Sequence, residues 1–322
     1  MAAIRIDLEK LQAEGLIGAD LARQIQARAL PDGRFSLFVN LALILGALAV
    51  AAGAIALVPN AVTGLLLALG AIGAAEAIRR FAPGASLKVL SAGLALMGVL
   101  GLAGWIGWQY GETEDATMPA LLITLVLGAG ALWFRSAFLM VLSVLALGAV
   151  FRTGTAYWHA CYGLFVEEPL ITIGVFGALA AGLYTLRGRI GEAWKNLTGI
   201  AARTAFFLVN FAFWVGSLWG DDLGERYRYA EGRSWEEWRA ATTHIPEAAF
   251  SVGWLVLLIA VMLRTRHGGF LSVTATVFLA IHAYTQYFET FGAQPWTLLV
   301  GGIALVGLAV GTAKLLKQPA SV

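Results

Sequence analysis

Residues 119–151 read PALLITLVLGAGALWFRSAFLMVLSVLALGAVF, and Arg135 is the one charged side chain among them. A single helix of this length would extend roughly 50 Å, whereas the hydrocarbon core of a bilayer is about 30 Å thick. A charge at the middle of such a helix would also be energetically expensive. We therefore expect a tight helical hairpin at Phe134–Arg135–Ser136, with one membrane span on each side. The alternative is one long tilted helix.

The rest of the chain has the same apolar character. Of its 322 residues, 59% are hydrophobic and 13% are charged, and the mean hydropathy is +0.76. A soluble domain has about 45–50% apolar and about 25% charged residues, so lipid must cover much of this surface. The composition excludes an ordinary soluble enzyme and a disordered chain. The net charge of +2 does not indicate a nucleic-acid partner, and the single cysteine, Cys161, excludes an internal disulfide.

Ten apolar runs are long enough to be candidate membrane spans, since a helix crosses the hydrocarbon with about 20 residues. They show no alternation of the kind that a β-barrel needs. The sequence therefore predicts an all-α, polytopic membrane bundle of about ten helices. The runs cover residues 35–58, 61–78, 87–108, 119–134, 136–151, 169–186, 201–219, 246–263, 270–288 and 295–313.

Lysine and arginine gather in alternate connections between these runs. With the N-terminus in the cytoplasm, the outside segments hold only Arg152, Arg226, Arg228, Arg233 and Arg239 of the 22 basic residues. This distribution follows the positive-inside rule. A nine-span chain would place the basic segment 187–203 outside. We therefore expect ten spans in a bacterial inner membrane, with both termini in the cytoplasm.

Two polar segments flank or interrupt the predicted transmembrane domain, residues 35–317. Residues 1–34 predict a cytoplasmic amphipathic helical head, which Gly15 and Gly18 interrupt, and residues 318–322 form a tail. The outside loop 220–245 contains Ser234 three residues before Glu237, a capping-box signature. We expect a short helix there, with Trp235 and Trp238 on one side. It would lie at the membrane interface or act as a lid over a site.

Glycine recurs at positions 98, 101, 104 and 107 of the run 87–108. Small residues let helix backbones approach closely in lipid, where hydrophobic burial supplies little attraction between helices. We expect these glycines to serve close helix packing.

Intramembrane polar residues are the candidates for a binding site. His282, Gln286 and Glu289 are spaced to share one helical face, and Asn210 lies in the middle of another span. They could line a cavity that opens to the outside and binds a proton or a small polar ligand. Alternatively, they form a polar cluster that hydrogen-bonds adjacent helices.

We find no nucleophile, metal or phosphate-binding motif of the kinds that mark common enzyme classes. We therefore expect no enzyme, no metal site and no cofactor.

Both ends of the chain carry familiar stretches: LEKLQAEGLIGADLARQIQ followed by LALILGALAVAAGAIAL near the start, and YTQYFETFGAQPWTLLVGGIALVGLAVGTAKLLK at residues 284–317. Together they resemble the bacterial predicted membrane proteins grouped as domain of unknown function 2157. In that family an aromatic Arg-Tyr-Phe-like motif opens the last hairpin, and here Gln286 stands where the family has a basic residue. The resemblance implies a bacterial inner-membrane protein and a periplasmic partner from a family named for a Gly-Asp-Tyr motif.

Three functions remain open. The first is a non-enzymatic membrane or envelope component that acts through a periplasmic or membrane protein partner. The second is a small-solute or lipid transporter, in which five spans on each side of residues 152–168 have opposite polarity in the membrane. The third, ranked last, is an intramembrane enzyme, which could assemble its site from separate helices without any of these motifs.

Overall fold

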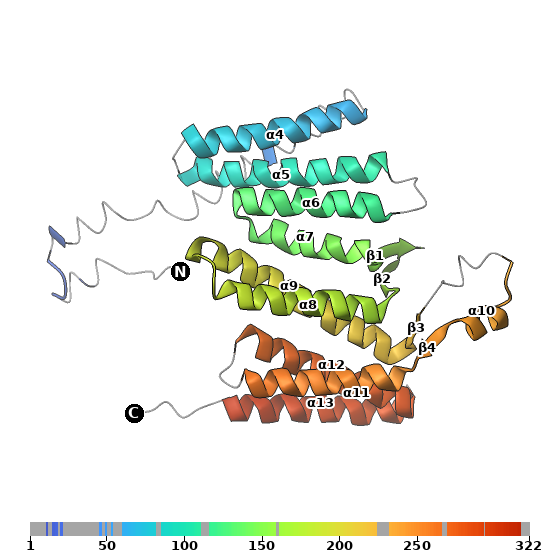
Figure 1. The fold of residues 1–322 in the computed structure, drawn as a ribbon. Helices are drawn as coiled ribbons and strands as arrows, with labels where there is room; N and C mark the ends of the chain where they lie inside the picture. The colour runs from blue at the N-terminus through green and yellow to red at the C-terminus, as the bar shows by residue number, and fades with distance from the viewer. Residues whose placement is uncertain are drawn as a thin grey trace. The chain divides into compact units, whose positions relative to one another are not determined.

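The computed structural model describes residues 60–81, 85–110, 116–158, 161–223, 232–265, 269–292 and 294–316, together with a few positions among the first 53. These residues are mostly helical (Figure 1), as the composition predicts. The chain divides into two compact units, Met1–Trp105 and Ile106–Val322, which are called unit 1 and unit 2 below.

Unit 1 contains helix α4 (Ala61–Phe81) and most of helix α5 (Ala85–Gln109). The α4 helix begins after Asn60, because the Asn60 side-chain oxygen accepts a hydrogen bond from the backbone N–H of Thr63 at 2.8 Å and so satisfies a first-turn donor. The two helices are joined by a buried hydrogen bond of 2.7 Å from the Ser91 hydroxyl to the Ala75 carbonyl.

The glycines of α5 divide into packed and unpacked positions. A Cβ atom built on Gly98 would lie 2.7 Å from the Ile72 side chain and 2.8 Å from the Ala68 carbonyl oxygen, whereas one on Gly104 or Gly107 meets none of the described residues within 4 Å. Gly101 is intermediate, at 3.3 Å from Ala68. The expected role in close helix packing is therefore confirmed for Gly98 and Gly101 and is not seen for the other two.

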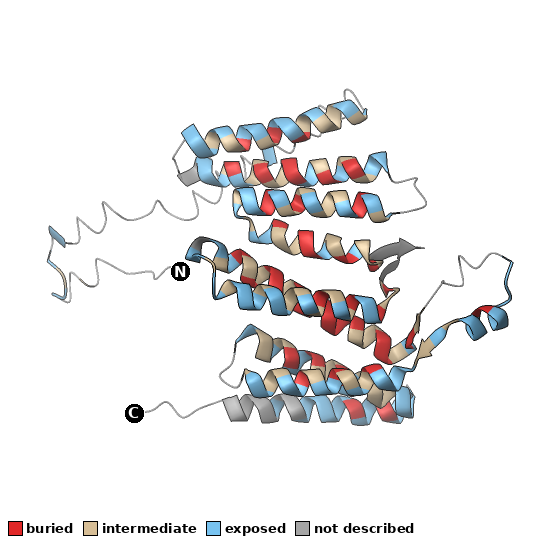
Figure 2. Cartoon of the chain, in the orientation of Figure 1, coloured by how far each residue is buried: buried red, intermediate tan, exposed pale blue. Residues whose placement is uncertain are grey.

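Unit 2 is a bundle in which α9 (Glu192–Trp219) is the central helix. In its apolar 18-residue stretch, 61% of the residues are buried, compared with 17% in the corresponding stretches of α8 (Pro169–Arg187) and α11 (Glu247–Arg264). Red buried positions accordingly run along α9 in Figure 2. It packs against α7 (Ala137–Val150), α8, α11 and α12 (Phe270–Phe291). The remaining long helices are α6 (Thr117–Phe134) and α13 (Pro295–Leu316).

The expected hairpin in residues 119–151 is present. Helix α6 ends at Phe134, Arg135 adopts a left-handed conformation (φ 52°, ψ 40°), and Ser136 caps α7 by accepting a hydrogen bond from the Leu139 N–H at 3.3 Å. A left-handed residue followed by a capping serine ends one helix and begins the next within two residues. The alternative of one long tilted helix is therefore wrong.

Two short β-hairpins interrupt the helices, which the sequence reading did not anticipate. Strand β1 (Thr153–Trp158) pairs with β2 (Cys161–Val166), and β3 (Asp221–Leu223) pairs with β4 (Thr243–Ile245), both antiparallel. Short helix α10 (Trp235–Ala241) lies between β3 and β4. The strands fall in the loops 152–168 and 220–245. Strands β1 and β2 are rich in β-branched and aromatic residues, which favour pairing, whereas β3 has the sequence Asp-Asp-Leu.

The two ends of unit 2 differ in character. The chain passes from α7 through β1 and β2 into α8, and from α9 through β3, α10 and β4 into α11, so both β-hairpins lie at one end of these helices, the hairpin end. Helices α6, α8 and α11 end at the other, basic end, which carries Arg135, Arg187, Lys195 and Arg264. The Arg135 guanidinium lies 5.5 Å from the Trp194 ring centroid, which joins the end of α6 to the start of α9.

Nine of the ten predicted runs coincide with helices of the described residues, and most boundaries agree within about three residues. The main exception is α9, which begins at Glu192 rather than 201, because its polar first turn is also helical and is closed by a 2.6 Å Lys195–Glu192 ion pair. The run 35–58 lies largely outside the described residues. Of the head 1–34, only a few positions are described; Gly15 has a φ of +70°, as a helix-ending glycine does.

Six described helices, α4, α5, α6, α8, α9 and α11, are long and apolar enough to cross a membrane. The chain is thus a membrane protein of helical type. Helix α7 has 14 residues and extends only about 21 Å, α12 is long enough but less apolar, and α13 is apolar over Pro295–Gly307. The count of ten spans and their orientation stay predictions.

Replacement of Gly98 by alanine should destabilise the fold by about 1–3 kcal/mol, because the new methyl group would overlap the α4 backbone, which cannot move aside cheaply. Gly104→Ala is the matched control: it adds the same group to the same helix in open space and should be neutral or slightly stabilising. Thermal unfolding of the full chain in detergent measures both. Equal shifts would contradict the packing role.

Candidate functional site

The buried polar residues of unit 2 meet where α9, α11 and α12 pack together. Asn210 of α9 is fully buried. Its amide nitrogen donates to the Phe206 carbonyl of its own helix at 2.8 Å, and its side-chain oxygen accepts from the Trp254 indole N–H of α11 at 3.0 Å. Both polar ends of this amide are thus bonded within the protein, as an apolar surrounding requires.

Trp254 connects Asn210 to His282. The Trp254 and His282 rings have centroids 4.7 Å apart and planes inclined at 57°. His282 Nε2 also lies 3.3 Å from the Ser251 hydroxyl, one turn before Trp254 on α11. His282 is 6% exposed, and among the described residues its Nδ1 has no hydrogen-bond partner. The two residues that the sequence singled out on α9 and α12 therefore belong to one cluster.

Gln286 and Glu289 are placed differently. They follow His282 along α12, and exposure increases in that direction: His282 is buried, Gln286 is half-buried and Glu289 is exposed. Of the three, only His282 belongs to the buried cluster. Gln286 and Glu289 lie closer to the end of the helix, at Phe291.

The sequence analysis missed two residues of this cluster, Trp254 and Ser251. An indole N–H in an apolar helix needs an acceptor, and Asn210 offers a mid-span amide oxygen. A search of the apolar runs for polar donors and acceptors that could bond to each other would have indicated Trp254 together with Asn210.

The cluster lies deep in the bundle. Asn210 precedes the end of α9 by nine residues, and His282 precedes the end of α12 by nine, which places each about 14 Å from the hairpin end of its helix. Four cavities along the described part of unit 2 are lined by largely apolar residues, and neither Asn210 nor His282 lines any of these four.

A second arrangement of polar residues fixes the hairpin end. Helix α8 begins with Pro169, which has no N–H, and the preceding Glu168 makes no side-chain cap. The first free donor of α8, the Leu170 N–H, instead bonds to the Asp221 carboxylate at 2.8 Å, from 51 residues further along the chain. A carboxylate at a helix N-terminus also interacts favourably with the helix dipole. Asp221, 4% exposed, therefore anchors β3 to the start of α8.

Strands β3 and β4 and the start of α10 are each held by further polar contacts. The Asp222 carboxylate and His244 Nδ1 are 2.7 Å apart across the two strands. Ser234 and Glu237 form the capping box that the sequence predicts at the start of α10. Together, β3, α10 and β4 form a small unit, called the β3–β4 module below.

The β3–β4 module presents an aromatic and cationic surface. Trp238 is buried and supports Trp235, with ring centroids 4.8 Å apart. Trp235 is 48% exposed, and the Arg239 guanidinium lies 5.8 Å from its ring centroid. Tryptophan and arginine are the residue types most enriched at the energetic centres of protein interfaces.

Comparisons with known proteins add no further assignment. No protein-family model, no curated protein and no solved structure matches this chain.

Trp254→Phe should lower the free energy of unfolding by about 1–2 kcal/mol, because the Asn210 oxygen loses its donor in an apolar interior. The matched control is Trp219→Phe. Trp219 is 68% exposed, so this substitution makes the same chemical change at the surface. Unfolding in detergent measures both. Asn210→Leu should cost less in the Trp254→Phe background than in the native chain. Independent, additive effects would contradict the pairing.

Proposed function

We propose that this chain is a non-enzymatic, multi-pass protein of a bacterial inner membrane that acts through a protein partner at its hairpin end. The observation that carries the proposal is the β3–β4 module. Asp221 anchors it to α8, and it presents Trp235 and Arg239 outside the bundle. The β3–β4 pairing and the capping box of α10 pre-organise the described part of this module, so little conformational entropy is lost there when it meets a partner.

The positive-inside rule supports an orientation for this surface. Arg135, Arg187, Lys195 and Arg264 belong to the basic end, which the rule assigns to the cytoplasm. The hairpin end then faces the periplasm. With the run 35–58 counted, the helices make ten spans, and both termini lie in the cytoplasm. The resemblance to the domain of unknown function 2157 family, which implies a periplasmic partner, agrees with this orientation.

The internal bonding of the Asn210–Trp254–His282 cluster favours a structural role over chemistry or transport. The Asn210 amide is hydrogen-bonded at both ends, and the Trp254 ring is in contact with the His282 ring. These contacts hold α9, α11 and α12 together, which is the alternative interpretation of the polar spans.

The transporter remains the second candidate, and one observation favours it. His282 Nδ1 is buried without a partner among the described residues, about 14 Å from the end of its helix. A group of this kind is suited to holding a water molecule or a proton on a path across the membrane. A continuous polar cavity reaching His282 would raise this candidate above the first.

A photo-crosslinking residue placed at position 235 tests the partner role in cells that make the native protein. We expect one defined protein adduct at position 235, because this side chain is exposed on the aromatic face of α10. The same crosslinker at Ala240 is the matched control, since Ala240 is also exposed but lies on the opposite side of α10. Mass spectrometry of the adduct identifies the partner.

Asp221→Ala in the crosslinking chain tests the anchor. It leaves α10 and its capping box intact but removes the acceptor of the Leu170 N–H. We expect the adduct at position 235 to fall several-fold while the chain still inserts into the membrane. Adducts of equal yield at positions 235 and 240, or no adduct at either, would contradict a docking surface on this face.

A further inference from the structure

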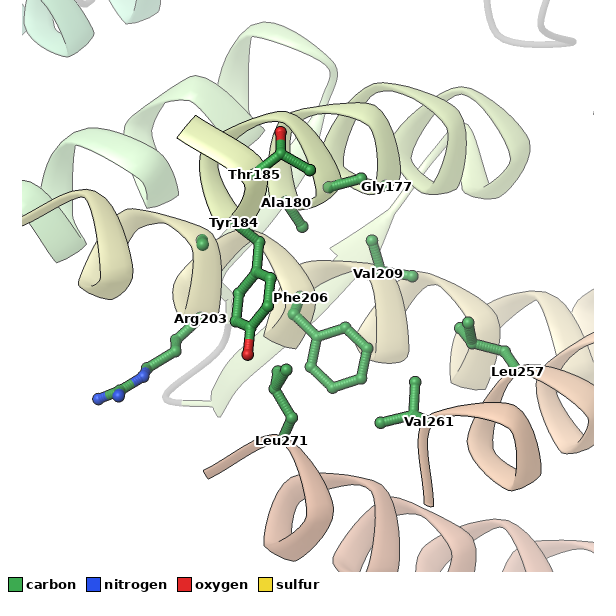
Figure 3. A pocket seen from close by; sticks show the side chains of 12 residues that line it. Gly177, Ala180, Tyr184, Thr185, Arg203, Phe206, Val209, Leu257, Val261 and Leu271 are labelled. Carbon is green, nitrogen blue, oxygen red and sulfur yellow. The ribbon is translucent and has the colours of Figure 1, made fainter. Parts of the chain in front are cut away.

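An apolar groove opens along the outside of unit 2, near its basic end. It has a volume of about 370 Å³, with α9 as its floor and α8 and α11 as its walls. Figure 3 shows the side chains that line it: Val209, Leu257 and Val261 lie toward one end, and Tyr184 and Arg203 lie toward the other. The volume falls within the range of about 300–1,000 Å³ that is typical of ligand sites.

Arg203 is the unusual member of this lining. It belongs to α9, about 16 Å beyond the first residue of the helix, and is half-buried. Its guanidinium lies 5.2 Å from the Phe270 ring centroid. In the described part of the chain no carboxylate lies within ion-pair distance of it. A cation inside an apolar helix is costly unless an anion or water reaches it.

A second arginine, at the end of α8, contacts α9 one helical turn before Arg203. The Arg187 side chain lies against Gly199, where a Cβ atom would be 3.2 Å from its Nε. Gly199 precedes Arg203 by one helical turn, so both arginines lie on the same side of α9. The Arg187 Nε is buried and has no hydrogen-bond partner among the described residues. A buried donor without an acceptor indicates a bound water or ligand at this position.

Arg203 also lies where two apolar grooves meet. On α9, the residues that line the first groove with it are 202, 206 and 209, whereas a second groove of about 390 Å³, toward α7, is lined by 200, 204 and 207. At 100° per residue these two sets lie on opposite flanks of position 203. At the start of α12, Leu271 lines the first groove and Phe270 the second.

We propose that Arg203 and Arg187 bind the phosphate of an anionic phospholipid from the leaflet at the basic end, with one acyl chain in each groove. Apolar grooves that open to the bilayer match acyl chains, and two guanidinium groups match a phosphodiester with a net negative charge. The half-exposed Tyr184, beside Arg203 in Figure 3, lines the head-group end of the first groove. This lipid site is independent of the proposed partner surface, which lies at the hairpin end.

Native mass spectrometry of the full chain in detergent, titrated with phosphatidylglycerol or with phosphatidylcholine of the same acyl chains, tests the proposal. We expect discrete binding of one phosphatidylglycerol, at least about tenfold tighter than that of phosphatidylcholine. Arg203→Gln should weaken the binding by about tenfold, and Arg203→Lys should restore part of it. The matched control is Arg189→Gln, which removes an exposed charge from the same basic end.

A second pair of variants tests the groove itself. Gly177 lines the groove, and a Cβ atom there meets nothing within 4 Å, so Gly177→Leu fills the groove without a clash at the Cβ position. Gly182→Leu adds the same side chain to the same helix on a different, exposed face. We expect only Gly177→Leu to weaken phosphatidylglycerol binding, by about tenfold, with both variants melting close to the native chain.

Three outcomes would overturn the proposal. The first is equal binding of the two lipids, and the second is equal loss in the two glycine variants. The third is saturation of the arginines by inorganic phosphate at affinities similar to that of the lipid, which would assign the site to a free anion.

Discussion

The hydrogen bond from the Trp254 indole to Asn210 shows the constraint on which the described bundle depends: in lipid, a polar group must find its partner inside the protein. The same constraint accounts for the Ser91 hydroxyl bonded to the Ala75 carbonyl and for the Ser143 hydroxyl bonded to the Thr124 carbonyl at 3.0 Å. Each bond joins two neighbouring helices. Helix α9 is central to unit 2: it carries Asn210 and packs against four other helices.

Hydropathy and the energetic cost of a charge in the hydrocarbon core predict most of the helices, because both depend only on local sequence. The turn at Arg135 is the clearest case, since length and one charge together exclude a single helix. The capping box at Ser234 is equally local. The β3–β4 pair was missed, because each strand has only three residues and α10 lies between them. Pairing of this kind depends on where α9 and α11 end in space.

The candidate site was predictable only in part for the same reason. Asn210 and His282 are visible in the sequence as polar residues within apolar runs, but nothing local says that Trp254 lies between them. Arg203 reads as a basic residue near the end of a span. Its position between two grooves depends on the packing of α7, α8, α11 and α12 around α9. The cluster around Trp254 and the grooves beside Arg203 are each built by several helices together.

The bond between Asp221 and the Leu170 N–H has a consequence for biogenesis. Translation produces α8 first, then α9, and only then Asp221, so the start of α8 enters the membrane without its cap. Until the ribosome has made α9 and that hairpin has turned back, water must satisfy the Leu170 donor. This cap of α8 can therefore form only after α9 has been made and β3 has reached the start of α8.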